Sequence, residues 1–435
     1  MYSIDWANLF SRVRRTPSAD GNAAATGGFP VVSHTVWALG WTSLLTDVSS
    51  EMVASILPLY LVLHLGMSPL AFGVVDGLYQ GAAALVRIAA GILSDRRGRY
   101  KAIAVTGYAL SAACRFLILP AGASWGSITG ITVADRIGKG IRTAPRDALI
   151  SQRSERSQLA TAFGVHRALD AAGAMFGPIV AFLLLARSPD DFDLLFVVSF
   201  AIAIVGVFVI VLFVPAHREG DAELDAKPLS LAAAMGLVTE PRFRAILVAG
   251  SLLGLATISD AFVYLVLQKG LALTAMAFPL LYVGTSLFNS LFSVPCGRLA
   301  DKYGRGLVLL AGYVVLGLVY LVTLAHSMSP LAVTLVAIAL FGAYYAATDG
   351  VLTAMAAAVL PASRSGSGLA LLATATNVSR LISSIVFGWL WTIMGPRAAT
   401  VSYFIALLAA IVVAAAVLSP EPHASTGTED SAQSA

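Results

Sequence analysis

The sequence predicts an all-α integral membrane protein with twelve transmembrane helices, arranged as two six-helix pseudo-repeats. Three observations predict this fold class: the composition is apolar, apolar segments of membrane-spanning length recur, and motifs of the first half return in the second. Of the 435 residues, 58% are hydrophobic and only 12% are charged, whereas soluble domains carry roughly 25% charged residues. A soluble protein of this composition would expose large apolar patches, so we expect the chain to lie in a lipid bilayer.

The first six predicted helices are separated by short breaks of charge, proline or glycine. A bilayer core about 30 Å thick requires about 20 helical residues. The predicted spans of the first half are 34–63, 69–93, 101–121, 125–149, 157–186 and 193–214. Residues 1–32 precede them as a tail, without the apolar core and cleavage site of a signal peptide.

The second half repeats this pattern after a polar loop. Its predicted spans are 243–268, 274–299, 305–326, 330–360, 366–394 and 398–418. The predicted domains are a six-helix bundle at 33–214, a middle loop at 215–242, a second bundle at 243–418 and a tail at 419–435. We expect the apolar stretch 229–238 of the middle loop to lie on the membrane surface.

Lysine and arginine indicate the orientation, because cytoplasmic loops carry an excess of them. Among the loops expected on the side opposite the N-terminus, the basic residues are Arg187, Lys269 and Arg397. The other loop cations cluster at 12–15, 96–101, 153–156, 218–244, 298–305 and 364. Both termini are therefore predicted in the cytoplasm, and the compact loops favour a bacterial inner membrane.

Two motifs of the first half recur in the second. Tyr60-Leu-Val-Leu63 returns as Tyr264-Leu-Val-Leu267, and GILSDRRGR at 91–99 returns as GRLADKYGR at 297–305. Such a parallel duplication predicts a substrate site near the bilayer midplane, between the two halves.

The loop motif, its second copy and the helix count resemble the signature of the major facilitator superfamily, and the resemblance covers the whole predicted transmembrane region. It implies a secondary transporter that works by alternating access and is not an enzyme. In the family, the aspartate at the position of Asp95 latches the outward-open state. The alternative is that these are loop charges that only set the orientation. The motif residues are Gly91, Asp95, Arg96, Gly98, Arg99, Gly297, Asp301, Gly304 and Arg305.

The fourth predicted helix carries DRIGKG at 135–140, which resembles the RxxqG motif of the superfamily. In proton-coupled members the arginine of this motif is linked to proton transfer, so the resemblance implies that role for Arg136. Lys139 stands where a glutamine is usual, and it adds a positive charge.

The fifth predicted helix carries Gly173-x-x-x-Gly177-Pro178, which resembles the gxxxGP motif of antiporters and drug exporters. The trailing glycine pair of that motif is absent. The alternative is a packing face of small residues, which lets two membrane helices approach closely.

Charges inside apolar spans are the main functional candidates, because a charge at the bilayer centre costs at least about 2.5–3.5 kcal/mol. Asp47 and Glu51 share one face of the first helix, since they are four residues apart. Carboxylates in low-dielectric surroundings can bind and release protons near neutral pH. The predicted proton-coupling residues are Asp47, Glu51, Asp76, Arg136 and Asp170.

The fourth helix also has a cationic face, which would suit an anionic substrate because arginine binds carboxylate or phosphate in a bidentate way. The predicted substrate-binding residues are Gln80, Arg87, Lys139, Arg142, Asp260 and Asn377. The alternative is internal pairing of Asp135 with Lys139 or Arg142, and of Asp170 with Arg167. Arg115 has no evident partner in the sequence.

These features predict proton-coupled antiport that exports a small organic solute. The alternative is proton-coupled symport that imports a small anionic metabolite, and a third hypothesis is a receptor or scaffold, which the buried charge disfavours. We expect a monomer whose partners are its substrate, protons and lipid. Without a GxxxxGK[ST] motif or metal-ligand spacing of His and Cys, we expect no ATP-driven pump, metal or cofactor, and the scattered loop cations predict no nucleic-acid partner.

Overall fold

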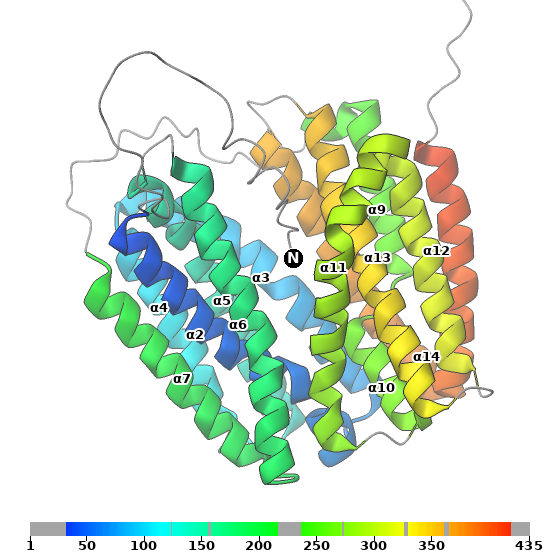
Figure 1. Ribbon diagram of the computed structural model, residues 1–435, viewed down its shortest axis with the longest axis horizontal. Coiled ribbons are helices and arrows are strands. Elements are labelled where there is room, and N and C mark those ends of the chain that lie inside the picture. Colours follow the sequence, from blue (N-terminus) through cyan, green and yellow to red (C-terminus); the bar gives the residue numbers. More distant parts are fainter. Residues whose placement is uncertain are drawn as a thin grey trace, which may run out of the picture.

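The computed structural model of the protein describes residues 32–122, 124–154, 158–215, 236–271, 274–325, 329–360 and 365–418. Every regular element in these ranges is a helix (Figure 1). The predicted tails and the middle loop as far as residue 235 lie outside the described residues. The predicted all-α fold class is confirmed.

The first half forms helices close to the predicted spans. Side-chain caps fix several starts: the side chains of Ser68, Ser124 and Asp191 each accept a backbone N–H of the helix that follows. The elements are α2 (His34–Leu59), its π-helical continuation η1 (Tyr60–His64), α3 (Pro69–Arg97), α4 (Tyr100–Leu117), α5 (Trp125–Gln152), α6 (Leu159–Arg187) and α7 (Phe192–Phe213).

The second half contains α9 to α14 and two short 3₁₀ turns. Its last element, α14, covers two predicted spans. They meet at a kink, where Gly395 has a positive φ of 82° just before Pro396. The elements are η3 (Leu237–Thr239), α9 (Pro241–Leu255), α10 (Asp260–Leu271), η4 (Ala275–Ala277), α11 (Phe278–Tyr303), α12 (Arg305–Leu324), α13 (Pro330–Val359) and α14 (Ser365–Leu418).

The predicted span 243–268 corresponds to one membrane-spanning stretch, Pro241–Leu271, but its helix is interrupted between Leu255 and Asp260, which the sequence did not predict. The hydroxyl of Tyr320 accepts the N–H of Ile258 at 2.8 Å and donates to the carbonyl of Ala256 at 3.3 Å. The hydroxyl of Ser383 donates to the carbonyl of Thr257 at 2.6 Å. These bonds replace those of a continuous helix, which a backbone inside a membrane requires.

Eight helical stretches of the described chain are long and apolar enough by themselves to cross a membrane. The helices α3, α4 and α5 are not among them. In α5 the reason is charge, since Asp135, Arg136, Lys139 and Arg142 lie within about two turns. The eight stretches become nine when α14 is divided at Gly395, and α3, α4 and α5 bring the spans in the described chain to the twelve that the sequence predicts.

The two halves contact each other mainly through α3 and α14, near the end where α3 begins, and also through α6 and α11. The N–H of Leu70 donates to the hydroxyl of Thr392 at 3.1 Å. The ring of Phe72 packs edge-on against Phe262 with centroids 5.0 Å apart, and Phe262 packs against Phe387 and Trp391. In Figure 1 the two groups of helices lie close together at the bottom and farther apart at the top.

Candidate functional site

A cavity of about 1020 Å³ lies between the two halves. The first half contributes residues of α2, α3, α5 and α6, and the second half contributes residues of α10, α11 and α14. Along α3 the lining runs from Phe72, beside the closed end, to Ser94 near the other end of the helix. The volume is ample for a small organic molecule.

The GKG sequence of α5 positions Lys139. A Cβ on Gly138 would lie 2.9 Å from the carbonyl oxygen of Gly107 on α4, and a Cβ on Gly140 would lie 2.8 Å from that of Ala83 on α3. Because both glycines pack directly on neighbouring backbone, α5 is held between α3 and α4. The side chain of Lys139 lines the cavity and is 35% exposed.

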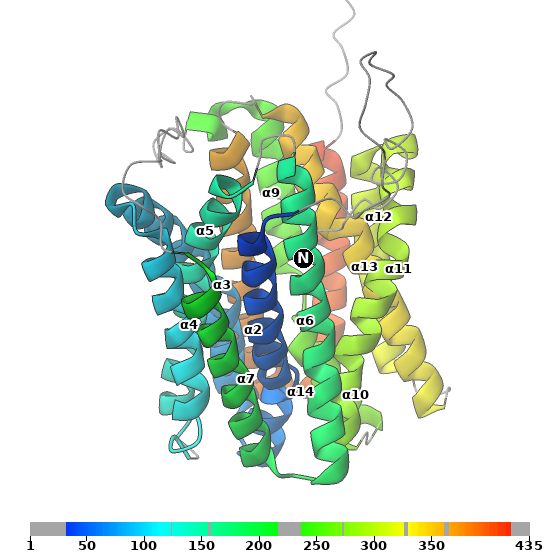
Figure 2. The same ribbon diagram turned by 60° about the vertical axis from the view of Figure 1, so that its left-hand side comes forward.

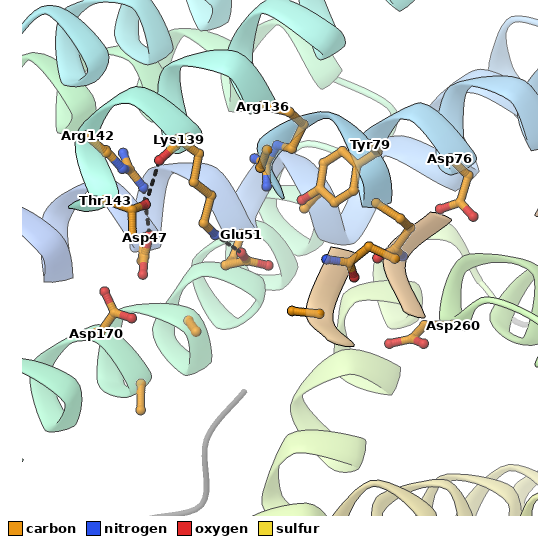
Figure 3. Close-up of a pocket in the computed structure, with 18 of the residues that line it drawn as sticks. Asp47, Glu51, Asp76, Tyr79, Arg136, Lys139, Arg142, Thr143, Asp170 and Asp260 are labelled. Atoms are coloured by element: carbon orange, nitrogen blue, oxygen red, sulfur yellow. Dashed lines mark hydrogen bonds and ion pairs between the residues drawn. The ribbon is translucent and has the colours of Figure 1, made fainter. Parts of the chain in front are cut away.

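The glycines of α6 bring its carboxylate to α2. A Cβ on Gly173 would lie 2.5 Å from the carbonyl oxygen of Leu44, and one on Gly177 would lie 2.7 Å from that of Val48. Figure 2 shows α2 and α6 side by side, in agreement with their contacts. This stretch, which ends at Pro178 on the cavity wall, is therefore a packing face, and the packing brings Asp170 to Asp47, so that the two carboxylates point toward one another (Figure 3).

Four ion pairs lie at and around these carboxylates. Arg142 Nη2 lies 3.1 Å from Asp47 Oδ1, and Lys139 Nζ lies 3.9 Å from Glu51 Oε1. Arg146 lies 3.0 Å from Asp147 and 3.6 Å from Asp170. The first-half wall of the cavity is therefore a network in which cations and carboxylates alternate.

The alternative in which Asp135 pairs with Lys139 or Arg142 is wrong. Asp135 Oδ1 lies 2.8 Å from Arg115 of α4, and its Oδ2 lies 2.5 Å from Arg136. Asp135 faces α4, because α5 turns a different side toward the cavity, and this interaction supplies the partner that the sequence did not show for Arg115. The guanidinium of Arg136 also lies 4.0 Å from the ring centroid of Tyr79.

The carboxylates near the second half meet hydroxyl groups. Asp76 of α3 accepts a hydrogen bond from Ser384, and Asp260, the first residue of α10, accepts one from Tyr345. Asp349 and Arg380 form a pair at 3.7 Å that is not part of the described cavity lining. Gln80 and Asn377 line the cavity as neutral amides, and the side chain of Arg87 lies outside the described part of the chain.

Both copies of the loop motif turn the chain at a glycine with a positive φ, although the two glycines differ in conformation. Gly98 ends α3 with a φ of 59°, and Gly304 joins α11 to α12 with a φ of 99°. In the second copy, Arg305 lies 3.6 Å from Asp301 and donates to the carbonyl of Ala354 on α13 at 3.0 Å, which ties α12 to α13. Arg99 lies in the turn between α3 and α4, and Gly297 lies inside α11. Gly91, Asp95 and Arg96 belong to the last part of α3, and their surroundings lie outside the described part of the structure.

Sequence reasoning missed four residues that contribute to the cavity or its support: Tyr79, Tyr282, Ser286 and Tyr345. Phenylalanine, tryptophan and tyrosine together make up 9% of the sequence, so in the sequence these tyrosines resemble ordinary helix-packing residues. A tyrosine near a lone intramembrane carboxylate is the one signal that could have drawn attention to them, since a buried hydroxyl requires a hydrogen-bond partner.

A sequence model described as Major Facilitator Superfamily matches residues 39–288 and 261–434. The chain belongs to this superfamily. A relative in Methanocaldococcus jannaschii, the uncharacterized MFS-type transporter MJ1317, is 31% identical over 370 residues, which cover 83% of this chain and 89% of the relative. The uncharacterized protein Rv2265 of Mycobacterium tuberculosis is 36% identical over 151 residues, or 35% of this chain.

Solved transporter structures have the same fold as this superfamily member. The nucleoside transporter NupG superposes with a TM-score of 0.76 at 14% identity, covering 89% of this chain and 100% of that one. A POT family transporter in complex with a thioalcohol-conjugated peptide superposes with a TM-score of 0.70 at 14% identity, covering 88% and 95% of the two chains. At these identities the likeness concerns the fold alone, and with the family match it makes the protein a multi-pass membrane transporter.

Proposed function

We propose that this superfamily member is a proton-coupled antiporter that exports a small organic solute, without catalytic chemistry of its own. The observation that carries the proposal is the meeting of Asp47 and Asp170 in the cavity wall, beside Arg142 and Arg146. Two carboxylates that face one another cannot both stay ionised at low cost, so one of them holds a proton. The adjacent guanidinium groups stabilise the remaining negative charge.

Antiport follows from competition between a proton and the solute. A positively charged group of a solute stabilises the ionised form of a carboxylate, and it therefore drives off the bound proton. The cavity offers such carboxylates on both walls. They are Asp47, Glu51, Asp76, Asp147, Asp170 and Asp260.

Export follows from the orientation that the loop cations predict. With both termini in the cytoplasm, the contact between Leu70 and Thr392 closes the outer end, and the cavity faces the cytoplasm. A monomer in the cytoplasmic membrane would then load solute from inside. The bundles 33–214 and 243–418 would rock about the cavity between them.

One observation favours symport of an anionic solute as a second candidate. The pair between Lys139 and Glu51 is the longest of those in the cavity, at 3.9 Å, and both side chains are partly exposed. Protonation of Glu51 would free Lys139 to bind a carboxylate or phosphate. Proton and anion would then move together.

Proteoliposomes that contain a pH-sensitive dye distinguish the two candidates. With no starting gradient, candidate solutes are added outside one at a time. Alkalinisation of the lumen supports antiport, because protons leave as the solute enters, and acidification supports symport. Asp47→Asn and Glu51→Gln are expected to abolish the coupled signal while solute exchange survives.

The matched control is Asp193→Asn, which neutralises an exposed carboxylate at the start of α7, away from the cavity. It should leave the dye signal unchanged. If Asp47→Asn keeps the full pH dependence of transport, Asp47 is not part of the proton site.

A further inference from the structure

We propose that the solute is a small zwitterion, with an amine at one end and a carboxylate or phosphate at the other. The inference rests on the proposed transport through this cavity, and it specifies the chemical class that the cavity selects. It follows from the unequal charge on the two sides of the cavity, of which one is cationic and the other anionic.

Lys139 is the cation of α5 that a ligand can reach. Arg142 is only 2% exposed, its guanidinium lies over the ring of Tyr108 at 4.7 Å, and its Nε and Nη1 atoms are enclosed. Arg142 is therefore committed to Asp47, at 3.1 Å. Lys139 is 35% exposed and its carboxylate partner lies 3.9 Å away, so an anionic group can approach it directly.

The surroundings of Lys139 carry a positive excess. Asp135 is shared between Arg115 and Arg136, so this cluster of three charged groups has one uncompensated positive charge. Arg136 and Lys139 both line the cavity. Since Glu51 balances only Lys139, an anionic group of the solute gains attraction from the remaining charge of this cluster.

On the opposite side of the cavity, the carboxylates have no cation to balance their charge in the part of the chain that the structure describes. Among the described residues, no cation lies within ion-pair distance of Asp76 or Asp260, which accept hydrogen bonds from the neutral hydroxyls of Ser384 and Tyr345. Both carboxylates line the cavity, and the break after α9 places Asp260 at the first turn of α10. A protonated amine supplies the missing positive charge, because a buried carboxylate is stabilised by a nearby cation.

Figure 3 shows the two sides in one cavity, with Lys139 and Glu51 on one side of Tyr79 and with Asp76 and Asp260 on the other. A solute with one charge would satisfy one side only and leave the other without a counter-charge. A zwitterion satisfies both at once.

The test is ligand-induced thermal stabilisation of the purified protein in detergent at fixed pH. The probes are the common L-amino acids and phosphoethanolamine at millimolar concentration, each amino acid also as its N-acetyl and its carboxamide derivative. We expect at least one zwitterion to raise the melting temperature, and each derivative that removes one charge to bind at least tenfold more weakly. Stabilisation by derivatives as strong as that by the parent overturns the proposal, and so does a panel in which no zwitterion binds.

Two variants assign the charges to their ends of the ligand. Lys139→Gln should weaken the zwitterion at least tenfold and leave the carboxamide unchanged, whereas Asp260→Asn should weaken the zwitterion and leave the N-acetyl form unchanged. Lys302→Gln, at the exposed end of α11, is the control and should change neither. If both cavity variants weaken all ligands alike, the assignment is wrong.

Binding in detergent needs no proton gradient, so the two proposals can fail separately. Zwitterion binding without proton movement in liposomes would contradict antiport and leave the ligand class standing. Proton-coupled movement of a singly charged solute, with no zwitterion bound or moved, would contradict the ligand class and leave proton coupling standing.

Discussion

In the first half of the chain most intramembrane charges pair with other charges along the cavity wall, whereas the charge that the described second half adds to the cavity lining, Asp260, meets a hydroxyl group. Arg142 pairs with Asp47 and Arg146 with Asp170, but Asp260 is held by Tyr345. The backbone differs too, since α2 runs unbroken into η1 while the corresponding span of the second half is broken between α9 and α10. The halves share a helix pattern, but the network of cations and carboxylates to which we assign proton transfer lies in the first, and the proposed solute contacts of Lys139, Asp76 and Asp260 come from both.

The largest expected effect is a difference in proton flux between variants that break an ion pair in the first half and in the second half. Asp47→Asn removes the carboxylate beside Arg142, and we expect substrate-driven proton flux in proteoliposomes to fall at least tenfold. Asp349→Asn breaks the pair with Arg380, which is not part of the described cavity lining, and we expect proton flux within about twofold of wild type, despite some loss of thermal stability. Equal loss of flux in both variants, after both are shown to be folded by gel filtration, would remove the distinction between the halves.

The broken span of the second half depends on one hydroxyl. Tyr320→Phe leaves the N–H of Ile258 without the partner it has at 2.8 Å. An unsatisfied buried group costs about 1–3 kcal/mol, so the melting temperature should fall and amide hydrogen exchange at 256–260 should accelerate. Tyr303→Phe, on an exposed side chain at the end of α11, is the control. Unchanged exchange in Tyr320→Phe would mean that another group supports the break.

The close packing of the first half depends on glycines of α6. Gly177→Ala places a methyl group 2.7 Å from the carbonyl oxygen of Val48, and such overpacking costs about 1–3 kcal/mol. Gly164→Ala, on the same helix, meets open space and should be neutral or slightly stabilising. Thermal unfolding of the two variants measures the difference, and equal melting temperatures would show that α6 can move off α2 without penalty.

The smallest expected effect is a difference in stability between alanine variants of the two loop motifs. Neither Gly98 nor Gly304 has a neighbour within 4 Å of an added Cβ, so alanine at either position tests the backbone alone. Gly98 has the left-handed angles φ 59° and ψ 12°, which other residues can adopt, whereas Gly304 has φ 99° and ψ 134°, where side chains are strongly disfavoured. Gly304→Ala should therefore destabilise by about 1 kcal/mol more than Gly98→Ala in thermal unfolding. The reverse order would show that the two turns are not held as the angles imply.

The sequence predicted the helices well because membrane-spanning length and breaker residues are local signals. It did not show the break after α9, because the groups that support the break, Tyr320 and Ser383, lie 62 and 126 residues away from the backbone that they bind. Helical spacing placed Asp47 and Glu51 on one face, and both do line the cavity.

Spacing could not show which side chains a ligand reaches. Arg142 shares a face with Lys139 in the sequence, yet Asp47 and Tyr108 cover it in the structure. Asp135 faces α4 because the neighbours of α5 are set by the packing of three helices, which one helix cannot reveal. The roles of Asp47, Asp170 and the other predicted site residues remain predictions to be tested by transport.

The most direct test of the account is proton release when ligand binds. Purified protein in unbuffered detergent solution is mixed with the compound that binds most tightly in the thermal-stabilisation experiment, whatever its class, and a pH indicator records protons entering or leaving the solution. The account predicts release by wild type and by Asp349→Asn, and loss of that release in Asp47→Asn. Proton uptake by wild type, or release that Asp47→Asn leaves unchanged, would contradict it.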